Sequence, residues 1–318
     1  MLAWLLCALG LVILLLAGDA LVKGAVNLSL RVGIPALIVS LTIVAFGTSA
    51  PELLIAINSV LENKPDIAMG NVVGSNTANI LLVLGVPAIL ATLHTSECNT
   101  RKTYIFMMLA TVLFIALAFT GSFGTWQALV LLAALAYVLF DAFRDAHKHR
   151  KGTAQAAVED EEEVEGADPN MPWWQIIVFL LLGLIGLPLG ADLLVDNASL
   201  IARDYGVSET VIGLTLVALG TSLPELATTT MAALRRQADV VLGSVIGSNM
   251  FNLLAIIGVA ALIGPIPVAP EFLRFDLWVM FGASVLLAPF VFMGWNITKT
   301  WGIGLTLAYF AYVVIVLF

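Results

Sequence analysis

The sequence Gly-Thr-Ser-Ala-Pro-Glu at residues 47–52 recurs as Gly-Thr-Ser-Leu-Pro-Glu at residues 220–225. The two motif glutamates, Glu52 and Glu225, are 173 positions apart (225 − 52), and each motif lies within a long apolar segment. An ionised carboxylate at membrane depth is costly unless a positive charge binds it. Two such groups at one register indicate a cation site built from two copies of one unit.

The composition is that of an all-α integral membrane protein. Hydrophobic residues make up 60% of the 318 positions, charged residues make up 11%, and the mean hydropathy is +1.02. A soluble domain of this size does not have these values. The apolar runs are continuous and about 20 residues long, which favours helices over barrel strands. We predict ten spans, at residues 2–22, 34–61, 67–93, 103–120, 123–143, 172–199, 207–233, 240–265, 270–293 and 298–317.

The offset of 173 extends beyond the first motif. The pattern Gly-x-x-x-Gly-Ser-Asn-x-x-Asn at residues 70–79 recurs at residues 243–252, and Asp19 matches Asp192. The sequence therefore predicts two five-helix repeats. Because five is odd, the second repeat starts on the opposite side of the membrane and the copies are inverted, as in many secondary transporters. The predicted division is residues 1–143 for the first repeat, 144–171 for a linker and 172–318 for the second repeat.

Charge distribution predicts the orientation. If the spans alternate from an outward N-terminus, eleven of the fourteen Lys and Arg residues lie inside. This positive-inside bias predicts the plasma (inner) membrane, with both termini extracytoplasmic and the central linker cytoplasmic. The linker has a basic stretch at residues 147–151 and an acidic run at 159–165. We interpret it as a solvated tether rather than a regulatory calcium site. We interpret the first apolar run as a span, because no basic leader precedes it.

The two prolines should break their helices. Pro51 lacks an N–H, and its ring clashes with the carbonyl of Gly47, four residues earlier. We expect the carbonyls near Ala45, Gly47 and Thr48 to lack helical donors. Irregular backbone at membrane depth persists where it is buried or lines a wet cavity. Together with the second motif, this predicts that helices 2, 3, 7 and 8 are broken around a central ion site.

A capping box is the alternative interpretation of the same motif. Ser49 and Glu52, like Ser222 and Glu225, have the Ser-x-x-Glu spacing that satisfies the start of a helix. An ionised glutamate in lipid needs more than a serine, and the motif occurs twice. We therefore favour ion ligation.

The second motif supplies neutral oxygens. Ser75 and Asn79 are four residues apart and so share a helix face, as do Ser248 and Asn252. The paired glycines have the small-x-x-x-small spacing that lets helices approach closely, and we assign them to packing: Gly70, Gly74, Gly243 and Gly247. We expect the intervening asparagines, Asn76 and Asn249, to bond backbone across helices.

Counting ligands favours calcium. Two carboxylates offer four oxygens, and the carbonyls of Thr48 and Thr221 offer two more. Six oxygens, with a water, meet the 6–8 that calcium takes. The remaining hydroxyls and amides suit smaller coordination shells such as that of sodium. If the glutamates are shared, calcium and sodium exclude each other, which an exchanger requires.

With these motifs the chain resembles the sodium/calcium exchanger superfamily, and in particular its compact prokaryotic members. The resemblance covers nearly all of both halves and implies ten helices in two inverted five-helix repeats. It implies that Glu52 and Glu225 bind calcium and also serve as ligands of sodium, and that the carbonyls of Thr48 and Thr221 complete the calcium shell. The implied sodium sites and central residues are Ala45, Ser49 and Ser75; Ala218, Ser222 and Ser248; and Asn79 with Asn252.

Two departures from the family accompany this resemblance. Some relatives, associated with potassium dependence, carry aspartate at the position of Asn252, so we expect no potassium co-transport. The linker also lacks the calcium-binding regulatory domains of animal members. On the first helix of each repeat, which is mobile in this family, Asp19 and Asp192 are assigned to packing or gating rather than to ligation.

The expected function is secondary antiport of calcium for sodium by alternating access. The alternative is a calcium/proton antiporter, or one for another divalent cation; that relative has Gly-Asn-x-x-Glu where this chain has Gly-Thr-Ser-x-Pro-Glu. An intramembrane enzyme is disfavoured, because no nucleophile or metal-binding histidine accompanies the glutamates, and a channel needs no closed cage. We expect no cofactor, no nucleic acid and a monomer, with bilayer lipid, calcium and sodium as the partners.

Overall fold

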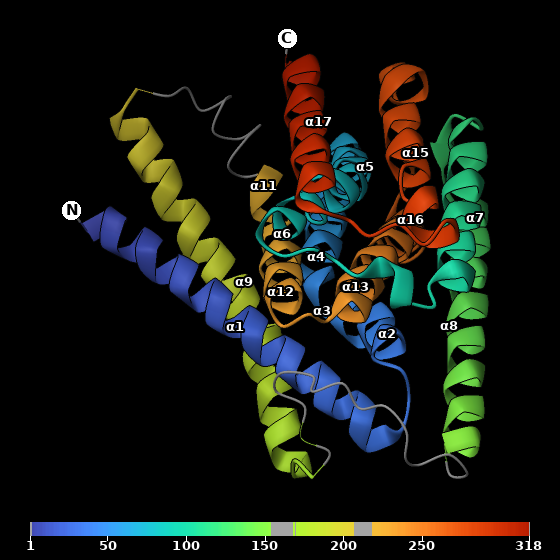
Figure 1. The fold of residues 1–318 in the computed structure, drawn as a ribbon. Helices are drawn as coiled ribbons and strands as arrows, with labels where there is room; N and C mark the ends of the chain where they lie inside the picture. The colour runs from blue at the N-terminus through green and yellow to red at the C-terminus, as the bar shows by residue number, and fades with distance from the viewer. Residues whose placement is uncertain (1, 154–167, 169, 207–217, 318) are drawn as a thin grey trace.

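The structure, a computed structural model, describes residues 2–153, 168, 170–206 and 218–317 and is helical almost throughout (Figure 1). The elements of the first half are α1 (Leu2–Val32), α2 (Ala36–Val39), the π-helical turn η1 (Ser40–Val44), α3 (Ala45–Thr48), α4 (Ala50–Leu61), α5 (Pro65–Leu81), α6 (Gly85–Leu90), η2 (Thr95–Glu97), α7 (Arg101–Ala118), β1 (Ser122–Phe123) and α8 (Thr125–Thr153).

The second half is also mainly helical. Its elements are α9 (Trp173–Asp204), α11 (Ala218–Gly220), α12 (Leu223–Leu234), α13 (Ala238–Met250), the π-helical turn η4 (Phe251–Ile256), α14 (Ile257–Ile263), β2 (Ile266–Pro267), the π-helical turn η5 (Phe272–Asp276), α15 (Leu277–Val285), α16 (Ala288–Phe292) and α17 (Lys299–Leu317). The two short strands pair antiparallel, with Phe123 opposite Ile266, and so tie the halves together.

Eight helical segments of the described residues are long and apolar enough to cross a membrane, and the bent pair Ala36–Thr48 and Ala50–Leu61 makes nine. The span expected at residues 207–233 begins outside the described residues, and its described part is α11 and α12. The protein is therefore a multi-pass, all-helical membrane protein.

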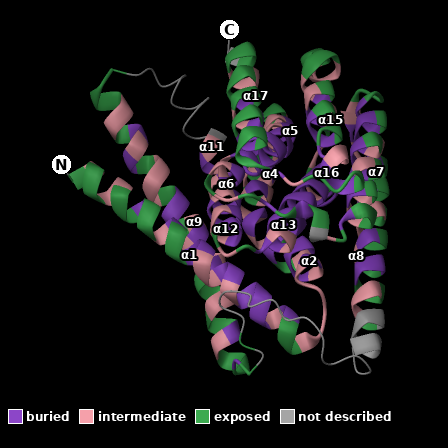
Figure 2. Ribbon diagram, in the orientation of Figure 1, coloured by how far each residue is buried: buried purple, intermediate pink, exposed green. Residues whose placement is uncertain are grey.

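The helices α1 and α9 form a crossed pair beside the main bundle (Figure 1). Their backbones approach at glycines: a Cβ on Gly10 would lie 2.7 Å from the Leu194 nitrogen, and one on Gly183 would lie 2.4 Å from the Leu21 Cβ. Small residues allow this approach in a lipid environment, where van der Waals packing drives helix association. The faces of both helices that point away from this contact are largely exposed (Figure 2).

Several helix ends differ from the sequence prediction. α1 continues to Val32 and α9 to Asp204, because each stops only where glycine adopts a positive φ: 72° at Gly33 and 79° at Gly206. α8 continues to Thr153, so the expected linker begins as helix rather than as loop near residue 145. Its charged residues include good helix formers, Arg and Lys, which extend a helix beyond its apolar part.

The core lies around α5 and α13. In the spans Pro65–Leu90 and Ala238–Ile263, 83% of the most apolar window is buried, against 44% or less in the other spans. Figure 2 shows this buried centre surrounded by helices with exposed outer faces. Both central spans are irregular near their middle: α5 and α6 are separated by a turn at residues 82–84, and η4 separates α13 from α14. Irregular backbone is thus buried in protein, as membrane depth requires.

Candidate ion-binding site

The predicted helix breaks are present in both motif copies. Between α3 and α4, Ser49 has φ −86° and ψ 4°, and the helix axis bends by 43°. Between α11 and α12, Ser222 has φ −89° and ψ 0°. Pro51 and Pro224 each occupy the first turn of the helix that follows, where a missing N–H costs nothing. Ser49 and Ser222, which are 173 residues apart, therefore have nearly the same backbone angles.

The two glutamates project from the first turns of α4 and α12 into the core. Glu52 and Glu225 are each only 1% exposed, and their carboxylates are near enough to interact electrostatically. The hydroxyl of Ser49 donates to Oε1 of Glu225 at 3.4 Å, and the Thr48 hydroxyl also faces that carboxylate. The first motif copy thus contacts the carboxylate of the second.

The serine half of the capping box is not formed in this structure, although each glutamate carboxylate accepts a hydrogen bond from its own backbone N–H. Neither Ser49 nor Ser222 makes a side-chain capping hydrogen bond to its own helix. The Ser49 hydroxyl is directed to the glutamate of the other copy instead. The motif serines therefore do not explain why the glutamates are buried.

Several buried oxygens of the predicted site have no hydrogen-bond partner among the described residues. They are Oε2 of Glu52 and of Glu225, Oδ1 of Asn79 and of Asn252, and Oγ of Ser248. A buried polar atom without a partner is costly, and such atoms are few in native proteins. Unpaired oxygens grouped on α4, α5, α12, α13 and η4, which pack on one another, have the chemistry of a hard-cation site.

Asn76 and Asn249 link the two central helices as predicted. The Asn76 amide donates to the Asn249 carbonyl at 3.3 Å, and the Asn249 amide donates to the Asn76 carbonyl at 3.5 Å. Asn249 also accepts from Nδ2 of Asn79 at 3.0 Å, which fixes the Asn79 amide. These bonds position Asn79 without using its Oδ1.

The remaining predicted residues occupy the same region. Ser75 is 6% exposed on α5, Ser248 is fully buried on α13, and Asn252 lies in η4. Thr221 lies in the turn before α12, and Ala218 begins α11. The structure thus places the serines and asparagines of the second motif on the helices that pack against α4 and α12.

One backbone expectation is wrong. The Ala45 carbonyl does not lack donors, because it accepts from the Ser49 nitrogen at 3.0 Å and from the Thr48 hydroxyl at 3.3 Å. The break begins only after this last helical hydrogen bond. The Ala45 carbonyl therefore still belongs to the hydrogen-bond pattern of α3. In the second copy the Ser222 nitrogen bonds Leu219 instead, so the two breaks differ at this point.

The packing role of the glycines is clear for one copy. A Cβ on Gly243 would lie 2.7 Å from the Leu37 carbonyl oxygen, and one on Gly247 would lie 2.5 Å from the Leu41 carbonyl oxygen. Around Gly74 no atom of the described residues lies within 4 Å of the corresponding position. The residues that would match Leu37 and Leu41 in the other copy are 210 and 214, outside the described residues.

Sequence reasoning missed Thr229. Its hydroxyl lies 2.8 Å from the Glu225 carbonyl oxygen and 3.1 Å from the carbonyl oxygen of Val83, in the break between α5 and α6. Thr229 is four residues after Glu225 and so shares its helix face, which was an available signal. The repeat hid it, because the matching residue in the first copy is Ala56.

We expect Thr229→Val to destabilise the protein by about 1–3 kcal/mol, because it leaves the buried Val83 carbonyl without this donor. The thermal midpoint in detergent measures the effect. Thr228→Val is the matched control: Thr228 is equally buried, but its hydroxyl bonds only within its own helix, to Pro224. Equal midpoints for the two variants would contradict a bridging role for Thr229.

The site has few charged ligands. Within the described ranges, no group of three or more His, Cys, Asp or Glu side chains could hold a metal ion. Two carboxylates surrounded by neutral oxygens can neutralise one divalent cation or smaller monovalent ones, and hard cations prefer such oxygens. Fold and site together define a membrane protein of the cation-antiporter class.

Comparisons with known proteins agree with this class. The family model described as "Sodium/calcium exchanger protein" matches residues 2–143 and 175–318. The chain is 36% identical to the putative antiporter CaxA of Alkalimonas amylolytica, over 87% of this chain and 86% of that protein. It is 32% identical to the sodium/calcium exchanger MaX1 of Methanosarcina acetivorans, over 99% and 98%.

A solved structure also matches. The sodium-calcium exchanger NCX_Mj, soaked with sodium and strontium, superposes with a TM-score of 0.80 at 30% identity, covering 99% of this chain and 98% of that one. The chain belongs to the sodium/calcium exchanger family.

Proposed function

We propose that this protein exchanges calcium for sodium across the membrane, with Glu52 and Glu225 as ligands shared by the two ions. The observation that carries the proposal is the burial of both carboxylates at one place, each with an oxygen that has no hydrogen-bond partner in the described structure. Two negative charges in a low-dielectric core need a cation, and a divalent ion neutralises both.

The proposed calcium shell adds the carbonyls of Thr48 and Thr221 to the two carboxylates. The proposed sodium ligands are the neutral oxygens around it, from Ser49, Ser75, Ser222, Ser248, Asn79 and Asn252. The unpaired Oγ of Ser248 and Oδ1 atoms of Asn79 and Asn252 support this part of the assignment. Ala45 and Ala218 complete the two proposed sodium sites; the Ala45 carbonyl already accepts two hydrogen bonds.

We also propose that the chain crosses the membrane ten times, as two inverted repeats of five helices. Contacts that recur under the offset of 173 support it. Gly10 packs on Leu194 and Gly183 packs on Leu21, which are the same contact with the two copies exchanged. The reciprocal backbone bonds of Asn76 and Asn249 have the same relation. A two-fold axis through the core produces such pairs.

In the proposed orientation both termini are extracytoplasmic and the central linker is cytoplasmic. The Lys and Arg distribution supports this in the plasma (inner) membrane. The protein would work as a monomer, with lipid, calcium and sodium as its partners and no cofactor.

A calcium/proton antiporter is the second candidate. The family includes antiporters whose names do not specify sodium, such as CaxA. The neutral oxygens beside the two carboxylates favour sodium, because protons need no such ligands.

Proteoliposomes test the proposal. Vesicles loaded with sodium and diluted into calcium should accumulate radioactive calcium, and replacing internal sodium with choline should reduce uptake to background. Exchange of one divalent ion for more than two sodium ions should also move charge, which a potential-sensitive dye detects. Uptake that persists in choline and follows an imposed pH gradient would instead support the proton-coupled candidate.

A further inference from the structure

The two sides of the candidate ion site differ in packing: a cavity lies on one side, and two helices are in contact on the other. A cavity of about 480 Å³ lies beside α9 and extends to both helix breaks, lined by Pro51, Thr221 and Pro224 together with Asp192 and Asp196. Residues of both motifs therefore line the cavity. The cavity extends from the two helix breaks along α9 to Arg203, near the end of that helix.

On the other side, α1 closes against α12. A Cβ on Gly18 would lie 3.0 Å from the Ala227 carbonyl carbon and oxygen, so the two backbones are in contact. One residue further along α1, Oδ1 of Asp19 accepts from Nε of Arg235 at 2.6 Å. Arg235 ends α12, and its side chain and that of Asp19 are 21% and 30% exposed. The ion pair thus joins α1 to the α12 terminus at a partly buried position.

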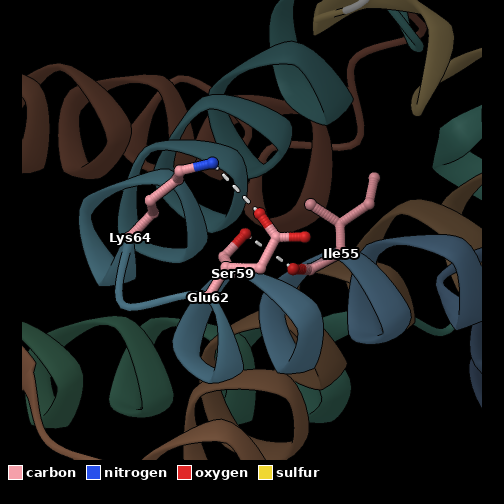
Figure 3. Close-up of polar contacts among 4 residues, drawn as sticks. All are labelled: Ile55, Ser59, Glu62 and Lys64. Carbon is pink, nitrogen blue, oxygen red and sulfur yellow. Dashed lines mark hydrogen bonds and ion pairs between the residues drawn. The ribbon is translucent and has the colours of Figure 1, made fainter.

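The two residues that the offset of 173 relates to this ion pair are both acidic. Asp19 corresponds to Asp192 on α9, which lines the cavity, and Arg235 corresponds to Glu62 at the end of α4 (235 − 173). Two carboxylates cannot form an ion pair. Glu62 instead pairs with Lys64, 3.1 Å away and well exposed (Figure 3). At these equivalent positions the sequence therefore provides an acid and a base on one side of the site and two acids on the other.

We propose that the Asp19–Arg235 ion pair is a one-sided latch. It holds α1 on α12, closes the route to the site on that side, and biases the resting protein toward the conformation with the cavity beside α9 open. The proposal rests on the proposed transport function, since it assigns the sidedness of that same site. Both residues act by positioning helices and do not touch the ion. In the proposed orientation, Arg235 is cytoplasmic, so the latch closes the cytoplasmic route.

Hydrogen–deuterium exchange of the purified protein in lipid nanodiscs tests the latch without transport. Asp19→Asn and Arg235→Gln should each speed exchange of α1 peptides around residues 15–26 about fivefold, the scale of one ion pair of ordinary strength. The charge swap Asp19→Arg with Arg235→Asp should restore the slow rate. A lost packing contact would not be restored by the swap. Wild-type exchange in both single variants, or no recovery in the swap, overturns the proposal.

Matched controls are available at neighbouring and equivalent positions. Arg236→Gln removes the same charge one residue away, and Asp192→Asn removes the equivalent acid; both should leave α1 exchange unchanged. Faster α1 exchange in either control would show a general charge effect and overturn the latch. Glu62→Arg supplies the missing partner for Asp192, so it should slow exchange of α9 peptides around residues 190–203; unchanged α9 exchange would also count against the proposal.

Transport separates this inference from the proposed function. In membrane vesicles of known orientation, Asp19→Asn should lower the calcium concentration for half-maximal uptake from the α12-terminus side about fivefold. If calcium exchange is absent in the wild type but the deuterium result holds, the latch stands and the proposed function fails. If exchange is present and the sided affinities of the variant equal those of the wild type, the latch fails.

Discussion

Glu52→Gln and Glu225→Gln should each abolish calcium transport, with at least about a 100-fold loss of uptake. A buried divalent cation is bound mainly by full negative charges, and each substitution removes one of two. An interaction of charged groups in a site of low dielectric is worth several kcal/mol, and about 1.4 kcal/mol corresponds to tenfold in affinity. Glutamine keeps the size and one oxygen, so the effect isolates the charge.

Calcium titration of the purified variants and radioactive calcium uptake in proteoliposomes measure this loss. Glu62→Gln is the matched control, because Glu62 lies at the other end of α4 with a side chain that is 63% exposed. It should transport as the wild type does. Both site variants should elute as folded protein, since a neutral amide costs less to bury than a carboxylate. Normal calcium exchange in either site variant refutes the ligand assignment.

The coarse fold followed from simple patterns. Continuous apolar runs predict helices, and the proline of each Gly-Thr-Ser-x-Pro-Glu motif predicts a break; α3 to α4 and α11 to α12 both have it. The helix ends were harder to predict. Hydropathy ends where polar residues begin, but a helix ends where its backbone can turn, which is at Gly33 and Gly206. α8 likewise continues past its apolar part to Thr153.

The candidate site was predictable to the extent that it repeats. Glu52 and Glu225 share one register, and both are buried as their pattern indicated. Asn76 and Asn249 were correctly expected to bond backbone across helices. Features that break the repeat were missed. Thr229 has Ala56 as its counterpart, and Arg235 has Glu62, so their contacts became visible only in three dimensions.

The second large effect is expected at Gly247, because the site depends on how closely α13 approaches α3. An added Cβ would lie 2.5 Å from the Leu41 carbonyl oxygen and 2.6 Å from the Ala45 Cβ. Leu41 in η1 and Ala45 in α3 lie two turns and one turn before Thr48 and Ser49, so rigid backbone rather than a flexible side chain must move. Overpacking of this kind costs about 1–3 kcal/mol.

Gly247→Ala should therefore weaken calcium binding at least about tenfold while the protein remains folded. The calcium–oxygen distances lie within a range of only about 2.3–2.6 Å, so a shift of a few tenths of an ångström between α3 and α13 separates ligands that must converge. Calorimetric titration of calcium gives the affinity, and the thermal midpoint gives the cost in stability.

Gly74→Ala is the control that separates packing from helix propensity. Gly74 occupies the equivalent position in α5, where no atom of residues 2–153, 168, 170–206 and 218–317 lies within 4 Å of an added Cβ. Because alanine favours a helix over glycine by about 1 kcal/mol, this variant should be as stable as the wild type or more stable, with calcium affinity retained. Identical binding by both alanine variants would mean that the α13–α3 contact does not set the ligand geometry. A loss of calcium affinity in Gly247→Ala alone would show that the contact between α13 and α3 sets the ligand geometry. That contact joins the second copy to the helix that ends in the first copy's motif.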